Sequence, residues 1–97
     1  MSDNINSKLW NAAGDGKEAL VSQLIEQGAE VDWRDEYGFT ALHTAADNGH
    51  IPVVNLLLDG GWSLESRTKI GSTPLYWAAA RGHLETARYE GIKKLKN

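Results

Sequence analysis

The chain contains no cysteine among its 97 residues. This absence excludes thiol nucleophiles, disulfides and cysteine-ligated metal sites. A secreted domain of this size usually depends on disulfides, so we expect an intracellular, cytoplasmic protein. Basic residues are also in short supply, with 10 Lys and Arg against 13 Asp and Glu and a net charge of −3. Because binding to phosphates requires an excess of basic side chains, we expect no nucleic-acid partner.

Long apolar runs are missing as well. No stretch approaches the roughly 20 apolar residues that a bilayer-spanning helix requires. The first six residues, Met-Ser-Asp-Asn-Ile-Asn, have neither a basic start nor an apolar run, so they do not read as a signal peptide. We therefore expect no association with a membrane.

Proline is scarce, and each of its two copies lies where a helix would begin. Pro52 and Pro74 fall in a first turn, where a missing N–H removes no intrahelical bond. Elsewhere, apolar residues recur at helical spacing and glycines follow the runs. The sequence therefore predicts short helices over residues 5–13, 17–27, 41–48, 51–59 and 75–81, and a last one from 83 onward. The polar, glycine-containing stretches between helical pairs predict projecting turns.

A period of 33 residues organises the chain. The residues that recur are Gly38, Thr40, Leu42, Ala45, Ala46, Gly49 and His50, which match Gly71, Thr73, Leu75, Ala78, Ala79, Gly82 and His83. The same shift in the other direction brings Leu42, Ala45, Ala46 and Gly49 onto Leu9, Ala12, Ala13 and Gly16. A fixed period of this length indicates stacked structural units.

This pattern resembles the ankyrin repeat, a 33-residue unit in which a β-turn precedes two antiparallel helices. Residues 73–85 carry most of its Thr-Pro-Leu-His, Ala-Ala and Gly-His signature, and residues 40–50 carry it again. The resemblance covers essentially the whole chain. It implies an all-α solenoid of three helix-turn-helix units joined by projecting turns. It also implies that His43 forms hydrogen bonds that hold neighbouring repeats together.

The repeat divides the chain into units at 1–34, 35–67 and 68–97. Two pairs of outer-helix positions change polarity between the first and third units: Leu20 and Leu24 become Thr86 and Glu90, whereas Glu18 and Gln23 become Leu84 and Tyr89. We expect the Leu20 pair to face the following repeat and the Glu18 pair to face the preceding one. The first and third units would then cap a closed array. A fragment of a longer array is the alternative.

Residue patterns typical of catalysis are not found. The serines lack a Gly-x-Ser-x-Gly context, and the Gly14-Asp15-Gly16 segment lacks the Lys-Ser/Thr of a phosphate loop. His50 and His83 occupy equivalent positions one repeat apart, so we interpret them as repeat positions and not as metal ligands. We therefore expect no enzymatic activity, no cofactor and no metal.

The resemblance implies that partners bind to the projecting turns and to the exposed ends of the inner helices. With the aromatic residue that precedes the first turn, the candidate residues are Trp33, Glu36, Tyr37, Phe39, Asp47, Asn48, Lys69, Ile70, Ser72 and Arg81. Exposed aromatic side chains near arginine are typical of binding hot spots. We expect Tyr37 to be exposed, whereas Phe39 could equally pack against the neighbouring turn.

The sequence thus predicts a non-enzymatic protein–protein interaction module, a small adaptor or inhibitor that is monomeric. The main alternative is a self-assembling domain that pairs through its aromatic turn. A small-molecule or enzymatic function would need a concave pocket with convergent polar groups, for which three short repeats leave little room.

Overall fold

The computed structural model describes residues 4–30, 32–83 and 88. This part of the chain contains no strand and five α-helices: α1 (Ile5–Asp15), α2 (Glu18–Glu26), α3 (Ala41–Asp47), α4 (Ile51–Asp59) and α5 (Pro74–Ala80). The predicted all-α architecture is confirmed, and the five helix positions agree with prediction to within two residues. Of the helix expected from residue 83 onward, only His83 and Arg88 are described: His83 is not helical and Arg88 is. The rest of that prediction lies outside the described residues.

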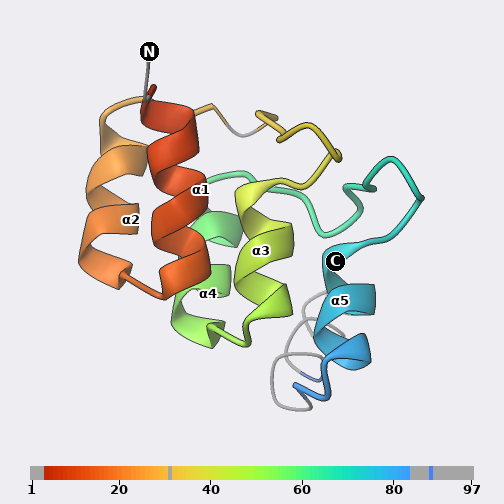
Figure 1. Ribbon diagram of the computed structural model, residues 1–97. Helices are drawn as coiled ribbons and strands as arrows, with labels where there is room; N and C mark the ends of the chain where they lie inside the picture. The colour runs from red at the N-terminus through yellow and green to blue at the C-terminus, as the bar shows by residue number, and fades with distance from the viewer. Residues whose placement is uncertain (1–3, 31, 84–87, 89–97) are drawn as a thin grey trace.

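The helices are stacked in two rows. Helices α1, α3 and α5 form the inner row, in which each packs against the next, and α2 packs against α4 in the outer row (Figure 1). Within a repeat, α1 packs against α2 and α3 against α4. The loops that precede α3 and α5 project beyond the helices (Figure 1). The arrangement is therefore a solenoid in which each helical pair buries its apolar face against its neighbours.

Side-chain caps set the starts of the inner helices. The Asn4 side chain accepts a hydrogen bond from the Ser7 N–H at the start of α1. Thr40 and Thr73 cap α3 and α5 in the same way. Pro74 follows Thr73 in the first turn of α5, where its fixed φ favours the helix. A cap of this kind contributes about 1 kcal/mol, which matters for helices of only seven residues.

Small residues allow the inner helices to approach closely. Ala13, Ala45, Ala46 and Ala78 are fully buried. The larger part of the core comes from leucine and valine side chains of the paired helices, among them the fully buried Leu42. Alanine at the contact between helices leaves room for the neighbouring backbone, so a larger side chain there would overpack the stack.

The Gly-His pairs join consecutive repeats. Gly49 ends the turn after α3 with a φ of +74°, and a Cβ placed on it would lie 2.8 Å from Nδ1 of the His83 ring. Gly16 has the same φ and the same relation to the His50 ring. Glycine is required at both positions because the left-handed backbone and the histidine ring leave no room for a side chain.

One predicted orientation is wrong. Leu20 was expected to pack against the following repeat, yet it is 38% exposed. Its counterpart Val53 is only 1% exposed, because α4 is covered by the preceding α2. The side of α2 that approaches the second repeat instead carries Ile25, whose Cγ2 lies 3.5 Å from where a Cβ on Gly60 would be. Leu20 therefore lies on the outward face of the first repeat, which no described element covers.

Candidate partner-binding surface

Two turns of similar shape project from the stack, at residues 35–39 and 68–72. In the first, the N–H of Asp35 donates to the carbonyl of Phe39 at 2.9 Å. In the second, the N–H of Thr68 donates to the carbonyl of Ser72, also at 2.9 Å. The Asp35 carboxylate further accepts the N–H groups of Tyr37 and Phe39. Each turn is thus closed by its own hydrogen bonds, and we refer to the two as the paired turns.

Hydrogen bonds also join one turn to the other. The Lys69 N–H donates to the Tyr37 carbonyl at 3.1 Å. The Arg34 guanidinium donates to the carbonyl of Gly38 at 2.9 Å and to that of Arg67 at 2.8 Å. The bonds from Lys69 to Tyr37 and from Arg34 to Arg67 hold corresponding segments of the two repeats in a fixed relation. The paired turns therefore present one preorganised surface.

Large side chains on this surface point into solvent. Tyr37 is 63% exposed and Ile70 is 79% exposed, and Glu36 and Lys69 beside them are also exposed. A hydrogen bond with Glu36, together with the negative charge of that carboxylate, raises the pKa of the Tyr37 hydroxyl. Tyr37 therefore remains a neutral donor at physiological pH. The predicted exposure of Tyr37 is confirmed.

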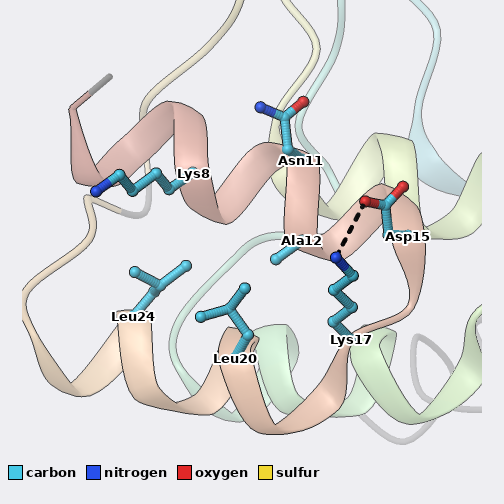
Figure 2. Close-up of a pocket in the computed structure, with 7 residues that line it drawn as sticks. All are labelled: Lys8, Asn11, Ala12, Asp15, Lys17, Leu20 and Leu24. Atoms are coloured by element: carbon cyan, nitrogen blue, oxygen red, sulfur yellow. Dashed lines mark ion pairs between the residues drawn. The ribbon is translucent and has the colours of Figure 1, made fainter. Parts of the chain in front are cut away.

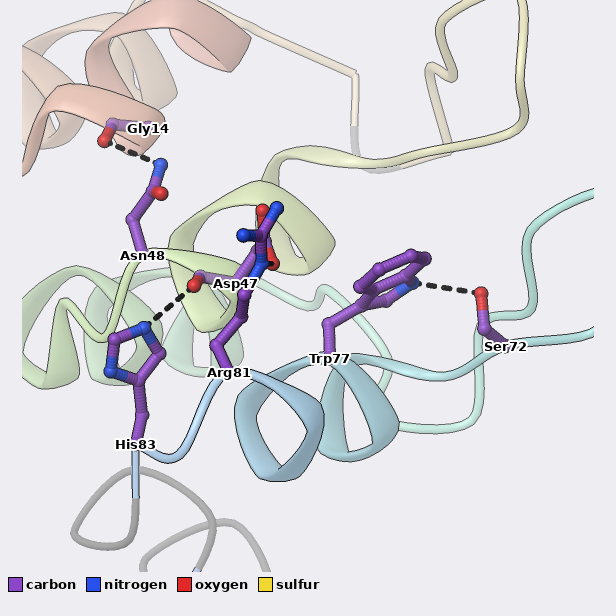
Figure 3. A network of polar contacts seen from close by, with 7 residues as sticks. All are labelled: Gly14, Asp47, Asn48, Ser72, Trp77, Arg81 and His83. Atoms are coloured by element: carbon purple, nitrogen blue, oxygen red, sulfur yellow. Dashed lines mark hydrogen bonds and ion pairs between the residues drawn. The ribbon is translucent and has the colours of Figure 1, made fainter.

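Ser72 does not belong to the exposed surface, contrary to prediction. It is only 8% exposed, because its Oγ accepts the Trp77 Nε1–H at 2.8 Å (Figure 3). The same hydroxyl also forms a hydrogen bond with the Thr68 hydroxyl. Phe39 is half-buried, with its ring centroid 5.2 Å from that of Trp77 and 5.6 Å from that of His43. Both residues therefore pack against the inner helices and stabilise the turns.

The inner-helix ends use several candidate residues to join repeats. Asn48 donates from Nδ2 to the Gly14 carbonyl at 2.9 Å, and one repeat later Arg81 donates from Nε to the Asp47 carboxylate at 2.7 Å (Figure 3). His83 donates from Nε2 to the Asp47 carbonyl at 2.7 Å. Sequence reasoning missed these contacts, although the 33-residue period aligns Asn48 with Arg81. Arg81 is exposed, whereas Trp33 and Asp47 are half-buried.

The His43 side chain forms hydrogen bonds through both of its ring nitrogens. It is fully buried, and its Nε2 donates to the carbonyls of Ser66 and Ser72 at 3.0 and 3.2 Å. Its Nδ1 accepts the Thr40 N–H at 3.1 Å. Since carbonyl oxygens only accept, Nε2 carries a proton. Since Nδ1 accepts the Thr40 N–H, it carries none, and the ring is therefore neutral. His43 ties α3 to the segment that leads into the second turn, as the resemblance implied.

The neutral ring of His43 makes the fold sensitive to acid. Burial lowers the pKa of His43 below its usual value of about 6.5. The unfolded chain therefore binds this proton at a higher pH than the folded chain does, and stability falls as the pH drops below about 6.5. We expect urea denaturation midpoints to decrease between pH 7.5 and 5.5. A His43→Gln variant should lose part of this decrease, and an unchanged slope would assign the acid sensitivity to other groups.

Trp10 occupies the place of His43 in the first repeat. Its Nε1 is buried and has no hydrogen-bond partner. Within residues 4–30, 32–83 and 88, no other buried side-chain nitrogen or oxygen lacks a partner. The first repeat therefore lacks the polar tie that His43 provides in the second, and Trp10 contributes packing instead.

Neither a membrane span nor a metal site is found in the part of the chain that the structure describes. Its helices are too short and too polar to cross a bilayer. Its histidine and carboxylate side chains do not gather in groups of three or more as metal ligands would.

Comparison with known proteins supports this architecture. A family model described as "Ankyrin repeats (3 copies)" matches residues 9–89. A 37-residue stretch, 38% of the chain, is 51% identical to the ankyrin repeat domain-containing protein SAT10 of the fungus Stachybotrys chartarum. That match covers 2% of the fungal protein's length, so the two proteins share a repeat unit over a short region.

Proposed function

Because the chain belongs to the ankyrin repeat family, whose repeats are generally non-enzymatic interaction modules, we propose that it binds a partner protein through its paired turns. The observation that carries the proposal is the combination of exposed Tyr37 and Ile70 with turns that are hydrogen-bonded to each other. The protein acts as a small adaptor or inhibitor inside the cell. Its three units, at 1–34, 35–67 and 68–97, form one domain.

The paired turns suit binding because their backbone is already ordered before a partner docks. Asp35 and Arg34 already hold the first turn closed and joined to the second. A partner that docks there pays a small conformational entropy cost, so more of the contact free energy appears as affinity. Tyr37 supplies a rigid amphipathic side chain and Ile70 supplies apolar area, which is the composition of an interface centre.

The residues around this centre have secondary roles. Glu36 and Lys69 form a charged rim of opposite signs, which favours a partner with complementary charges. Exposed Arg81 extends the surface along the inner helices. Asp47 and Asn48 form hydrogen bonds with neighbouring repeats. They therefore contribute to partner binding indirectly, by holding Arg81 and the ends of the inner helices in place.

Replacing Tyr37 by alanine separates binding from stability. Since the ring is exposed, we expect the melting temperature of Tyr37→Ala to stay nearly unchanged, while partner affinity falls by about 1–2 kcal/mol. The partner is first captured from a lysate of the host and identified, and its affinity for both proteins is then measured by calorimetry. An unchanged affinity, or an unfolded variant, would contradict the assignment of Tyr37 to the binding surface.

Self-association through the aromatic turn is the second candidate, because Tyr37 and Ile70 are exposed side by side in sequence-equivalent turns. Light scattering over a hundredfold range of concentration distinguishes the two. A concentration-independent monomer removes self-association, whereas a dimer that Tyr37→Ala dissociates would establish it.

A further inference from the structure

The turn between α3 and α4 contains the only asparagine-glycine pair of the chain, Asn48-Gly49. An asparagine in this context is prone to deamidation, because glycine has no side chain to hinder attack of its backbone nitrogen on the asparagine amide. Asn48 is exposed and forms the C-cap of α3, so water reaches its side chain. The pair is therefore placed where a covalent modification of the asparagine can occur.

The folded turn holds Asn48 in a conformation that does not react. The reaction begins when the Gly49 nitrogen bonds to Cγ of Asn48, so that nitrogen must rotate toward Cβ. The ψ of Asn48 is 2°, which eclipses the Gly49 nitrogen with the Asn48 nitrogen and turns it away from Cβ on the tetrahedral Cα. The Gly49 N–H also donates to the Ala46 carbonyl at 3.1 Å. Asn48 Nδ2 donates to the Gly14 carbonyl at 2.9 Å (Figure 3). These bonds must break first, so the reaction proceeds from a locally open state.

The position of Asn48 carries a hydrogen-bond donor wherever a repeat precedes it. In the second repeat Asn48 donates to the last turn of α1, and in the third repeat Arg81 donates to the end of α3. In the first repeat the equivalent residue is Asp15, which instead pairs with Lys17 at 4.0 Å (Figure 2). A carboxylate thus occupies this position only where no described repeat precedes it.

Deamidation replaces this donor by a group that only accepts. A carboxylate at position 48 cannot donate to the Gly14 carbonyl, and its negative charge is unfavourable near the C-terminus of α1. His50 cannot compensate as Lys17 does for Asp15, because its Nε2 already donates to the Gly14 carbonyl at 3.1 Å. Isoaspartate, the second product, also adds a methylene to the backbone of a tight turn. Both products therefore weaken the contact between α1 and α3.

We propose that Asn48 is a deamidation site, that opening of the turn between α3 and α4 permits its modification, and that the product weakens the contact between the first two repeats. The Gly49 nitrogen bonds to Cγ of Asn48, and the side-chain amide nitrogen leaves as ammonia with the proton that the Gly49 nitrogen gives up. Water then opens the succinimide ring at either carbonyl and yields aspartate or isoaspartate. Water is the one co-reactant, and no group is oxidised or reduced.

Mass spectrometry of the full chain tests the first part of the proposal. The protein is incubated at mildly alkaline pH in native buffer and in denaturing urea, and its peptides are then mapped. In urea we expect Asn48 to exchange its amide for a carboxyl group faster than any other asparagine. In native buffer the reaction should be at least about tenfold slower, because only the open fraction reacts. An isoaspartyl methyltransferase with labelled S-adenosylmethionine identifies the isoaspartate product.

Three variants show whether opening controls the reaction. His43→Ala removes buried hydrogen bonds of α3, so it should raise the open fraction and speed deamidation in native buffer. Tyr37→Ala alters an exposed side chain and should leave the rate unchanged. Asn48→Gln should abolish the reaction at this position, because glutamine must close a larger and less favourable ring.

Asn48→Asp tests the effect of the product on the contact between repeats. We expect amide hydrogen exchange of α1 to become about fivefold faster, the equivalent of the roughly 1 kcal/mol that one hydrogen bond contributes. Asn48→Arg, which restores a donor as Arg81 does one repeat later, should exchange at nearly the wild-type rate.

Three results would overturn the proposal. Equal rates in native buffer and in urea would show that the folded turn does not control the reaction. Absence of reaction at Asn48 in urea would exclude the modification. Wild-type exchange in both Asn48→Asp and the purified deamidated protein would show that the product leaves the repeats in contact. The kinetics use the wild-type chain, so they test the site even if Asn48→Asp does not fold.

Discussion

Replacing His43 by alanine is expected to destabilise the domain by on the order of 3–4 kcal/mol. The substitution leaves the carbonyls of Ser66 and Ser72 and the N–H of Thr40 without their partner in a buried site. Each unsatisfied buried group costs about 1–3 kcal/mol, and the lost ring adds a cavity. In a domain of this size each kcal/mol lowers the Tm by about 4–8 °C. Urea denaturation monitored by circular dichroism measures the effect.

Tyr76→Ala provides a matched control because Tyr76 occupies the same repeat position as His43. Tyr76 is 55% exposed, and its ring contacts that of Trp77 edge-on with centroids 5.3 Å apart. An aromatic pair of this kind contributes about 1 kcal/mol. We therefore expect a loss near that size for Tyr76→Ala. Similar losses for the two variants would show that the hydrogen bonds of His43 do not hold the repeats together.

Replacing Gly38 by alanine is expected to cost about 2–4 kcal/mol and to weaken partner binding. Gly38 has a φ of +86°, a conformation that costs an L-residue roughly 1–2 kcal/mol. In addition, a Cβ at this position would lie 2.8 Å from the backbone nitrogen of Lys69 and 3.2 Å from Cα of Thr68. Since these atoms belong to the backbone, the second turn must move away from the first.

The Gly71→Ala variant separates the cost of the positive φ from the cost of the steric clash between the turns. Gly71 occupies the equivalent place in the second turn, with a φ of +83°, but a Cβ there meets no atom within 4 Å. We expect this variant to lose only the roughly 1–2 kcal/mol due to backbone conformation. Urea denaturation of both variants gives the difference directly. Equal losses would contradict the close packing of the paired turns.

Much of the fold follows from local signals in the sequence. The 33-residue period identifies equivalent residues. The caps at Thr40 and Thr73 set helix starts because each threonine side chain needs as partner only the backbone N–H three residues further along the chain. Glycine before histidine predicts the reversal between paired helices. These features depend on nearby residues and on a repeat that the sequence displays openly.

Features that depend on the rotation of a helix were not predicted correctly. The period shows that Leu20 and Val53 are equivalent, but not which neighbour that position faces, and the polarity pattern suggested the wrong one. Ser72 was misplaced for a related reason. Ile70 and Gly71, which precede it, are exposed, and only the three-dimensional position of Trp77 provides the donor that draws its hydroxyl inward.

Photo-cross-linking tests the central claim, that the paired turns are the surface on which the partner docks. A benzophenone side chain is placed at position 37 in one variant. In the control variant it replaces Gln23, an exposed residue of outer helix α2. Each protein is then illuminated in host lysate. We expect a discrete adduct from position 37, and none from position 23, with the same partner that wild-type protein captures. The account is contradicted by an adduct with that partner from position 23 alone, or by equal adducts from both positions.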